Sequence, residues 1–115
     1  MIYQEDKQII IPFLIKLLKT GKYSSTQIVA NFYKSPVSRM YKYSFNDSKI
    51  RELVNYIRRN QIEPLLSNRT GYWISYDIVE IYESYNDLSN RIEKMEDACQ
   101  GLKKIMTKIN KNKNK

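Results

Sequence analysis

The sequence predicts a mainly α-helical fold in which a head domain, residues 1–75, precedes one long helix, residues 76–110. Three observations lead to this prediction. Apolar residues recur with helical spacing in three segments of the head domain, and two short apolar runs follow the third segment. Beyond residue 75, an apolar repeat with alternating steps of three and four residues continues to residue 109. The remaining residues, 111–115, alternate Lys and Asn and are expected to be a disordered basic tail.

The first helix is expected around Pro12, because the missing N–H of proline is tolerated in a first helical turn. It would end near Lys19, and Gly21 supplies a stop signal. The alternative is a start near Glu5 with a kink at Pro12. Residues 1–8 are otherwise expected to be frayed. The side chains that this helix would bury are Phe13, Leu14, Leu17 and Leu18.

The second helix is expected over residues 25–33. Ser24 and Gln27 have the spacing of a capping box, in which each side chain accepts from the backbone N–H of the other residue. Pro36 ends the helix. Residues 37–45 are compatible with either a short extra helix or an ordered loop. The side chains that the second helix would bury are Ile28, Val29 and Phe32.

The third helix is expected over residues 46–60, with Asn46 or Asp47 as its N-cap. Its apolar residues have the spacing of one amphipathic stripe. They are Ile50, Leu53, Val54 and Ile57. The opposite face carries basic and hydrogen-bonding side chains, as expected for a helix that lies in a DNA groove.

Two apolar runs, residues 62–66 and 72–74, flank a polar turn and predict a β-hairpin. Pro64 places the first strand at a sheet edge or bulge, and Asn68 or Gly71 can adopt a positive φ at the turn. Three helices followed by a hairpin are the pattern of a winged helix-turn-helix, in which the hairpin is the wing.

The long helix is expected to begin after Ser75 or Asp77, either of which can cap it. The 3,4 repeat predicts a coiled coil and a homodimer, whereas the alternative is one amphipathic helix packed on its own head domain. Arg91 and Glu96 would be a complementary pair between parallel chains, but the orientation stays open. The expected oligomerisation residues are Ile78, Ile81, Tyr85, Leu88, Ile92, Met95, Cys99, Leu102, Met106 and Ile109.

The charge is distributed unevenly along a chain whose net charge is +8. Residues 1–75 carry 12 Lys and Arg against 5 Asp and Glu, residues 76–102 carry 2 against 7, and residues 103–115 carry 6 against none. A basic balance of this size indicates a polyanionic partner, and the basic head domain is the expected DNA-binding part.

Several residue types that enzymes and metal sites need are scarce. Histidine is absent, Cys99 is the single cysteine, and the 3 glycines form no phosphate-binding loop. We therefore expect no enzyme activity, no metal and no cofactor. The apolar run of residues 9–18 contains Pro12 and Lys16 and is too short to span a membrane, so a cytoplasmic protein without a membrane partner is expected.

A family resemblance follows from several segments. They are Lys-Ile-Arg-Glu-Leu-Val-Asn-Tyr-Ile-Arg-Arg at 49–59, Pro-Leu-Leu-Ser-Asn at 64–68, Gly-Tyr-Trp-Ile at 71–74, the loop and helix start at 20–28, and Gly101-Leu102. Together they resemble the small winged-helix DNA-binding proteins of phages and prophages. The resemblance implies a regulator of transcription or a replication-associated DNA binder in a bacterial cell or a phage-infected host. Residues 34–45 depart from the family pattern as an insertion.

In a winged helix the third helix enters the major groove, and its outer side chains meet base edges. Asn55 suits adenine, and Glu52 either accepts from a cytosine amino group or pairs with Arg59 or Lys49. The candidate DNA contacts on this helix are Ser48, Lys49, Arg51, Glu52, Asn55 and Arg59.

Further DNA contacts are expected outside the third helix. Asn68 and Arg69 at the wing turn suit the DNA backbone or the minor groove. Ser25 and Thr26 lie at the N-terminus of the second helix, where free N–H groups bind phosphate. Lys42 is the remaining candidate contact. It belongs to the one cluster with the composition of a single-strand stacking site, formed by Arg39, Tyr41, Lys42 and Tyr43.

These observations predict a dimeric protein that binds duplex DNA and acts as a regulator or in replication. The alternative is a phage-encoded interaction module that inhibits a host nuclease or polymerase complex. The acidic residues between Asp77 and Asp97 favour that alternative, because DNA would repel them.

Overall fold

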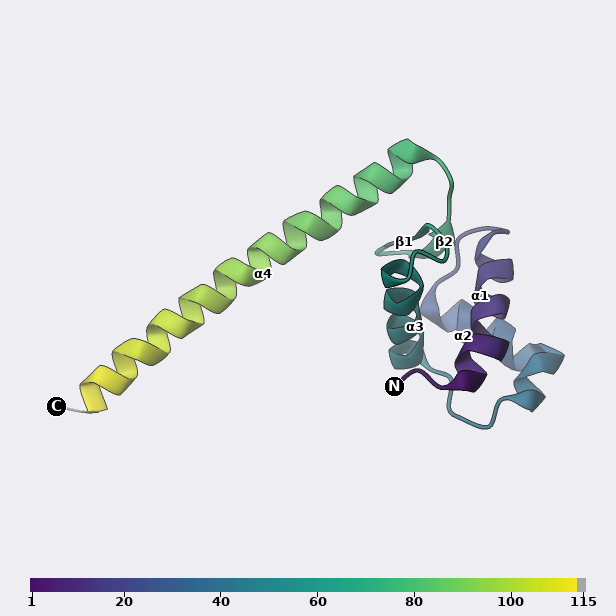
Figure 1. Cartoon of the computed structure of the whole chain (residues 1–115), viewed down its shortest axis with the longest axis horizontal. Helices are drawn as coiled ribbons and strands as arrows, with labels where there is room; N and C mark the ends of the chain where they lie inside the picture. The colour runs from purple at the N-terminus through teal and green to yellow at the C-terminus, as the bar shows by residue number, and fades with distance from the viewer. Residues whose placement is uncertain (114–115) are drawn as a thin grey trace. The chain divides into compact units, whose positions relative to one another are not determined.

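The computed structural model describes residues 1–113 and is mainly helical (Figure 1). The elements are η1 (Asp6–Ile10), α1 (Ile11–Leu18), α2 (Ser25–Lys34), η2 (Pro36–Met40), α3 (Asp47–Arg59), β1 (Leu65–Asn68), β2 (Gly71–Ile74) and α4 (Ile78–Lys113). The chain divides into two units, the first being Met1–Ile81 and the second beginning at Tyr82. The predicted three helices, hairpin and long final helix are therefore present.

The first helical segment follows the alternative with the early start. Residues 4 and 5 are already helical, and η1 is a π turn in which the Ile11 N–H donates to the carbonyl of Asp6. This wider turn lies just before Pro12, which cannot donate a backbone hydrogen bond itself. The expected frayed N-terminus is therefore wrong. Phe13 and Leu17 are half-buried rather than buried, and the fully buried side chains are Ile10, Ile11, Leu14 and Leu18.

The capping box of α2 is confirmed. The Ser24 hydroxyl accepts from the Gln27 N–H at 3.2 Å, and the Gln27 side-chain oxygen accepts from the Ser24 N–H at 2.9 Å. After α2, the connection to α3 folds into η2 and a loop that buries two rings against Phe32. The ring centroids of Tyr41 and Phe45 lie 5.9 and 4.5 Å from that of Phe32. Both the short helix and the ordered loop are therefore present.

Helix α3 begins and ends as predicted. Asn46 is the N-cap, and its side chain accepts from the Lys49 N–H at 3.0 Å. The four residues of the apolar stripe are all buried. At the C-terminus, Gln61 adopts a φ of 55°. The Gln61 N–H donates to the Arg58 carbonyl and the Ile62 N–H to the Ile57 carbonyl, which are the two bonds of a Schellman motif.

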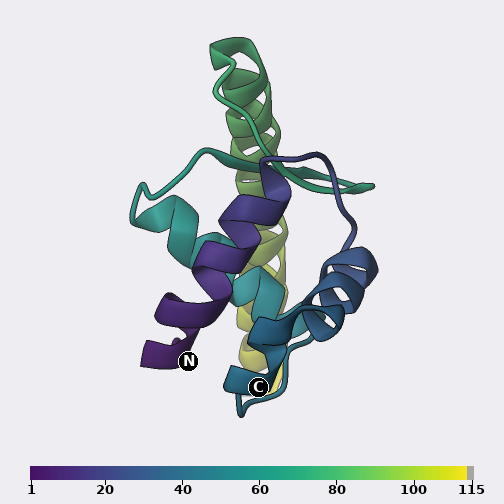
Figure 2. The same ribbon diagram turned by 90° about the vertical axis from the view of Figure 1, so that its right-hand side faces the viewer.

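The hairpin pairs β1 with β2 antiparallel, with Asn68 opposite Gly71. The loop after α1 passes beside the hairpin (Figure 2). There Tyr23 and Tyr72 exchange two backbone hydrogen bonds of 3.0 and 2.8 Å. Gly71 is the turn residue with positive φ, at 156°, and a Cβ there would lie 2.5 Å from the Tyr23 carbonyl oxygen. The close approach of the loop therefore requires glycine.

Helix α4 is 36 residues long and is uninterrupted to Lys113. Asp77 caps it by accepting from the Val79 N–H at 2.9 Å, as predicted. The helix therefore extends past the expected end at residue 110 and includes the first part of the expected disordered tail, whose residues 114–115 lie outside the described part. Within residues 1–113, no helix combines the length and the apolar character that crossing a membrane requires.

Candidate nucleic-acid interface

The exposed surface of α3 presents four of the predicted DNA contacts. Arg51, Asn55 and Arg59 follow one another at four-residue steps and so form a row along one side of the helix. Ser48 lies beside this row in the first turn. All four residues are exposed, and together we call them the outer face of α3.

Lys49 does not belong to this outer face. Its side chain is 11% exposed, and its Nζ lies 3.2 Å from Asp6 Oδ2 and 3.4 Å from Glu52 Oε2. The same ammonium donates to the Met1 carbonyl at 2.7 Å and lies 4.9 Å from the centre of the Tyr3 ring. Because the charge and donors of Lys49 are engaged within the protein, it is a weaker candidate for a groove contact than the residues of the outer face.

Glu52 pairs inside the protein, which was one of the two predicted possibilities. Its carboxylate contacts Lys49 and the Met1 amino group rather than Arg59. Hydrogen bonding from the Met1 amino group, together with the Lys49 ammonium, lowers the pKa of the Glu52 carboxyl from its ordinary value of 4.5. A carboxylate held in this way is a poor acceptor for a cytosine amino group.

Residues Met1–Tyr3, which we call the N-terminal arm, lie along one side of α3. Beside the contacts of Met1 with α3, the arm and the helix line an open hollow of about 510 Å³. Its lining consists of Met1, Ile2, Lys7, Glu52, Asn55, Tyr56 and Arg59. The arm therefore borders the outer face of α3 and narrows the surface that DNA could approach.

Asp6 anchors the segment that carries the arm. Its carboxylate is fully buried, and it accepts from the Tyr3 N–H at 2.8 Å and the Tyr41 hydroxyl at 2.5 Å. The Lys49 ammonium supplies the opposite charge. Burial, together with the hydrogen bond to the Asp6 carboxylate, raises the pKa of the Tyr41 hydroxyl well above its ordinary range. Buried charges need such partners, and these contacts fix η1 against α3.

The predicted single-strand stacking cluster is contradicted by the same geometry. Tyr41 is 7% exposed, and its ring packs in the core against Phe32. The Tyr43 ring stacks on Tyr3 at a centroid distance of 4.1 Å. Lys42 is exposed, with its Nζ 3.8 Å from Glu5 Oε1. Tyr41 is therefore buried and one face of the Tyr43 ring is covered by Tyr3, so the cluster does not present two free rings to bases.

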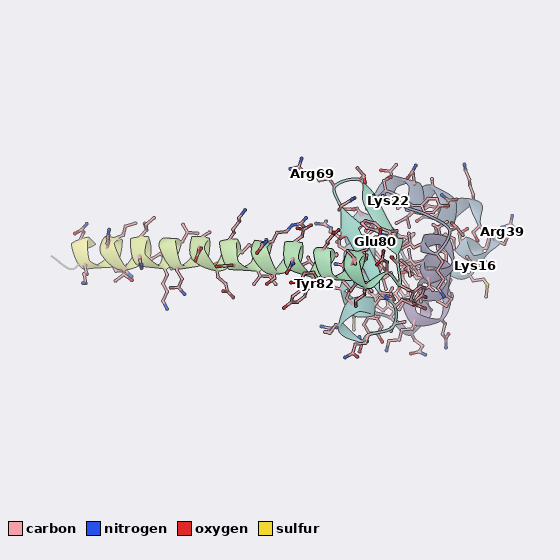
Figure 3. All side chains as sticks on the ribbon, turned by 90° about the horizontal axis from the view of Figure 1, so that it is seen from above. Lys16, Lys22, Arg39, Arg69, Glu80 and Tyr82 are labelled. Atoms are coloured by element: carbon pink, nitrogen blue, oxygen red, sulfur yellow. The ribbon has the colours of Figure 1, made fainter. Side chains whose placement is uncertain are left out.

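Two DNA contacts are predicted at the hairpin turn. Asn68 is engaged in the turn itself, whereas Arg69 is exposed. Asn68 Oδ1 accepts from the Thr70 N–H at 2.9 Å, the Thr70 hydroxyl at 2.8 Å and the Gly71 N–H at 3.2 Å. Asn68 therefore shapes the turn with its carbonyl oxygen. Arg69 is exposed at the tip and points away from the strands (Figure 3).

The N-terminus of α2 lies against α3. The Ser25 hydroxyl donates to the Asp47 carboxylate, so this side chain is occupied by a contact between the two helices. Thr26 is exposed. Ser24 takes the Gln27 N–H, so the backbone N–H groups of Ser25 and Thr26 are the candidates for a phosphate, and the Asp47 carboxylate beside them opposes its binding.

One basic contact beside the hairpin was not predicted. Lys22 Nζ lies 4.4 Å above the centre of the Trp73 ring, within cation–π distance. Lys22 belongs to the loop that pairs with β2, so the pairing of Tyr23 with Tyr72 brings this cation to the hairpin. No local sequence signal could have revealed it, because the two residues lie far apart in the chain.

Comparison with protein-family models, curated protein sequences and solved structures found no significant match. The resemblance to phage winged-helix proteins therefore stays a prediction. Among residues 1–113, no group of three or more Cys, Asp or Glu side chains is arranged to hold a metal ion. The geometry and charge of the first unit and the apolar surface of α4 are the features that bear on function.

Proposed function

We propose that this chain is a winged-helix protein of the phage type that binds duplex DNA as a dimer, as a regulator or in replication. The observation that carries the proposal is the pairing of Tyr23 with Tyr72. It places a strand-like segment between α1 and α2 against the second strand of a hairpin that follows α3. This order of elements and this pairing are typical of winged helices and support the proposal.

The outer face of α3 is the surface proposed to enter the major groove. Asn55 and Arg59 are its main base contacts. Arg51 is a weaker candidate, because its Nε lies 3.2 Å from the Asp47 carboxylate, whereas Arg59 makes no ion pair with any residue that the structure describes. Arg69 at the hairpin tip and the N-terminus of α2 would contact phosphates on either side.

The surface of α4 supports a dimer. Seven of the ten expected oligomerisation residues are large apolar side chains that are at least half exposed. They are Ile78, Tyr85, Ile92, Met95, Leu102, Met106 and Ile109. A continuous apolar stripe of this length is costly to leave in water, and a second helix with the same stripe can cover it.

A matched pair of variants tests the DNA contact. We expect Arg59→Gln and Asn55→Ala to weaken binding to a selected duplex by at least tenfold in fluorescence anisotropy, because each good base contact contributes about 1–3 kcal/mol. Arg39→Gln removes the same charge from the exposed end of η2 and is the control. Circular dichroism checks that all three variants remain folded.

Two results would overturn the proposal. Wild-type protein that fails to bind duplex DNA even at low salt would refute DNA binding. Equal losses of DNA affinity for Arg59→Gln and Arg39→Gln would mean that net charge alone attracts DNA. Helix α3 would then make no base-specific contact through Arg59. A salt series supports the contact if affinity falls steeply with ionic strength, because phosphate contacts release counterions.

A protein-docking module is the second candidate. It is favoured by the charge of α3, where Asp6 and Glu52 offset Lys49 and Asp47 offsets Arg51. In this case one host nuclease or polymerase subunit would bind stoichiometrically at physiological salt. The Arg59→Gln variant would then lose that partner. Neither this variant nor the wild-type protein would bind DNA.

A further inference from the structure

We infer that the α4 helices of two copies pair antiparallel, so that the N-terminal half of each covers the C-terminal half of the other. This inference rests on the proposed dimer and specifies its geometry. It commits the apolar stripe of α4 to one occupant, a second copy of the same helix. The symmetry of the stripe permits this pairing, and the sizes of its side chains and the charges of the two halves of α4 favour it.

The stripe reads the same in both directions. Its ten positions alternate steps of three and four residues and end, as they begin, with a step of three. In an antiparallel pair every position therefore meets another member of the stripe. The facing pairs are Ile78 with Ile109, Ile81 with Met106, Tyr85 with Leu102, Leu88 with Cys99, and Ile92 with Met95.

Side-chain volume favours this pairing. A parallel pair in register would place two Tyr85 rings in one layer and two small Cys99 side chains in another layer, two heptads further along. The antiparallel pair places Tyr85 against Leu102 and Cys99 against Leu88 instead. The layers then have similar volumes, and close packing tolerates neither an overfilled layer nor a void.

Charge favours it as well. Residues 78–93 contain four carboxylates and one Arg, whereas residues 94–109 contain four Lys and two carboxylates. Parallel helices would align the acidic halves with each other and the basic halves with each other. Antiparallel helices place the acidic half of each beside the basic half of its partner. Most of these charges lie at outer heptad positions, where salt screens them, so the preference is modest, and it opposes the one direct complementary pair of a parallel dimer, Arg91 with Glu96.

The orientation fixes the distance between the points where α4 begins. In the antiparallel pair Ile78 of one chain lies opposite Ile109 of the other, and 31 rises of about 1.5 Å separate the two Ile78 residues by about 47 Å. In a parallel pair they would be direct neighbours. The two first units therefore join the coiled coil at opposite ends.

Single-cysteine chains test the orientation. Wild-type protein carries Cys99, and the double variant Leu88→Cys/Cys99→Ser carries one cysteine at the facing position. We expect neither chain to form a disulfide-linked dimer alone under a glutathione redox buffer. We expect an equimolar mixture, unfolded and refolded together, to form a linked heterodimer. Linked homodimers of wild-type protein alone would overturn the antiparallel pairing.

A distance measurement does not depend on disulfide geometry. Lys108→Cys in a Cys99→Ser background carries a spin label on the outer side of α4. Antiparallel helices separate the two labels by 29 rises, about 44 Å, whereas parallel helices hold them within about 25 Å, the width of two helices. A dipolar distance in the shorter range would refute the inference.

Solution mass separates the two possible failures. A monomer in analytical ultracentrifugation at micromolar concentration would refute the dimer and, with it, part of the proposed function. A dimer with linked Cys99 residues and short label distances would refute the antiparallel orientation alone. A mass of four chains would overturn the two-helix arrangement.

Discussion

Replacing Lys49 by Met is the sharpest test of the buried ion pair. The change keeps the length and apolar stem of the side chain but removes the ammonium that lies 3.2 Å from Asp6 Oδ2. Asp6, which is 0% exposed, would retain its hydrogen bonds from Tyr3 and Tyr41 and lose its cationic partner. Removing one partner of a buried pair costs about 3–5 kcal/mol. We expect about 3 kcal/mol, because Lys49 itself retains some exposure.

The reciprocal change should cost less. In Asp6→Asn, the Lys49 ammonium keeps Glu52 at 3.4 Å and its partial contact with water. We expect a loss of about 1–2 kcal/mol, typical of a weakened hydrogen-bond network. The double variant should lose less free energy of unfolding than the two single variants lose together, because neither charge is then left without its partner.

Urea unfolding followed by circular dichroism measures these losses. The protein concentration must be held constant, because dimerisation makes apparent stability depend on it. A stabilising role for the ion pair of Lys49 with Asp6 is refuted if Lys49→Met changes the free energy of unfolding by less than about 0.5 kcal/mol, or if Asp6→Asn costs more than Lys49→Met. Loss of DNA affinity in a Lys49→Met variant of unchanged stability would restore Lys49 as a groove contact.

Three further predictions follow from the backbone and from Glu52. Gly71→Ala places a Cβ 2.5 Å from the Tyr23 carbonyl oxygen and should lower the free energy of unfolding by about 2 kcal/mol or more; an unchanged melting temperature would contradict this close approach. Gln61→Gly relieves a side chain at φ 55° and should stabilise the protein by about 0.5–1 kcal/mol, whereas the control Gln61→Ala should give no gain. The pKa of Glu52 is lowered in the folded state, so its stabilising effect is present above its ordinary value of 4.5 and is lost as the pH falls through the folded value. Glu52→Gln should therefore flatten the acid side of the stability profile, and an identical profile for both proteins would refute the ion pair.

The sequence could predict those parts of the fold that depend on local chemistry. The spacing of Ser24 and Gln27 identified the start of α2, and the stripe from Ile50 to Ile57 identified the buried side of α3. The Asp77 cap was equally visible. In each case the residues that form the interaction lie within one or two helical turns of each other, so their spacing alone determines the geometry.

The site was less predictable because its decisive contacts join distant residues. Lys49 lies at the border of the apolar stripe, where a long side chain can turn either outward or inward. It turns inward because Asp6, 43 positions earlier, is buried beside it. Asp6 lies in a segment that the sequence predicts to be frayed, so its burial could not be predicted. The burial of Tyr41 could not be predicted either, because it depends on the contact with Phe32.

The segment between α2 and α3 has a consequence for how this protein can be shortened or varied. The rings of Tyr41 and Phe45, both from this segment, pack against Phe32. The ring of Tyr43 stacks on Tyr3 of the N-terminal arm. Trimming the connection to the tight turn of a minimal helix-turn-helix would therefore delete part of the core rather than a surface loop. A change in the length of this connection would also displace the N-terminal arm. The arm borders the outer face of α3, so that border would move as well. A minimal version of this protein must keep the connection whole.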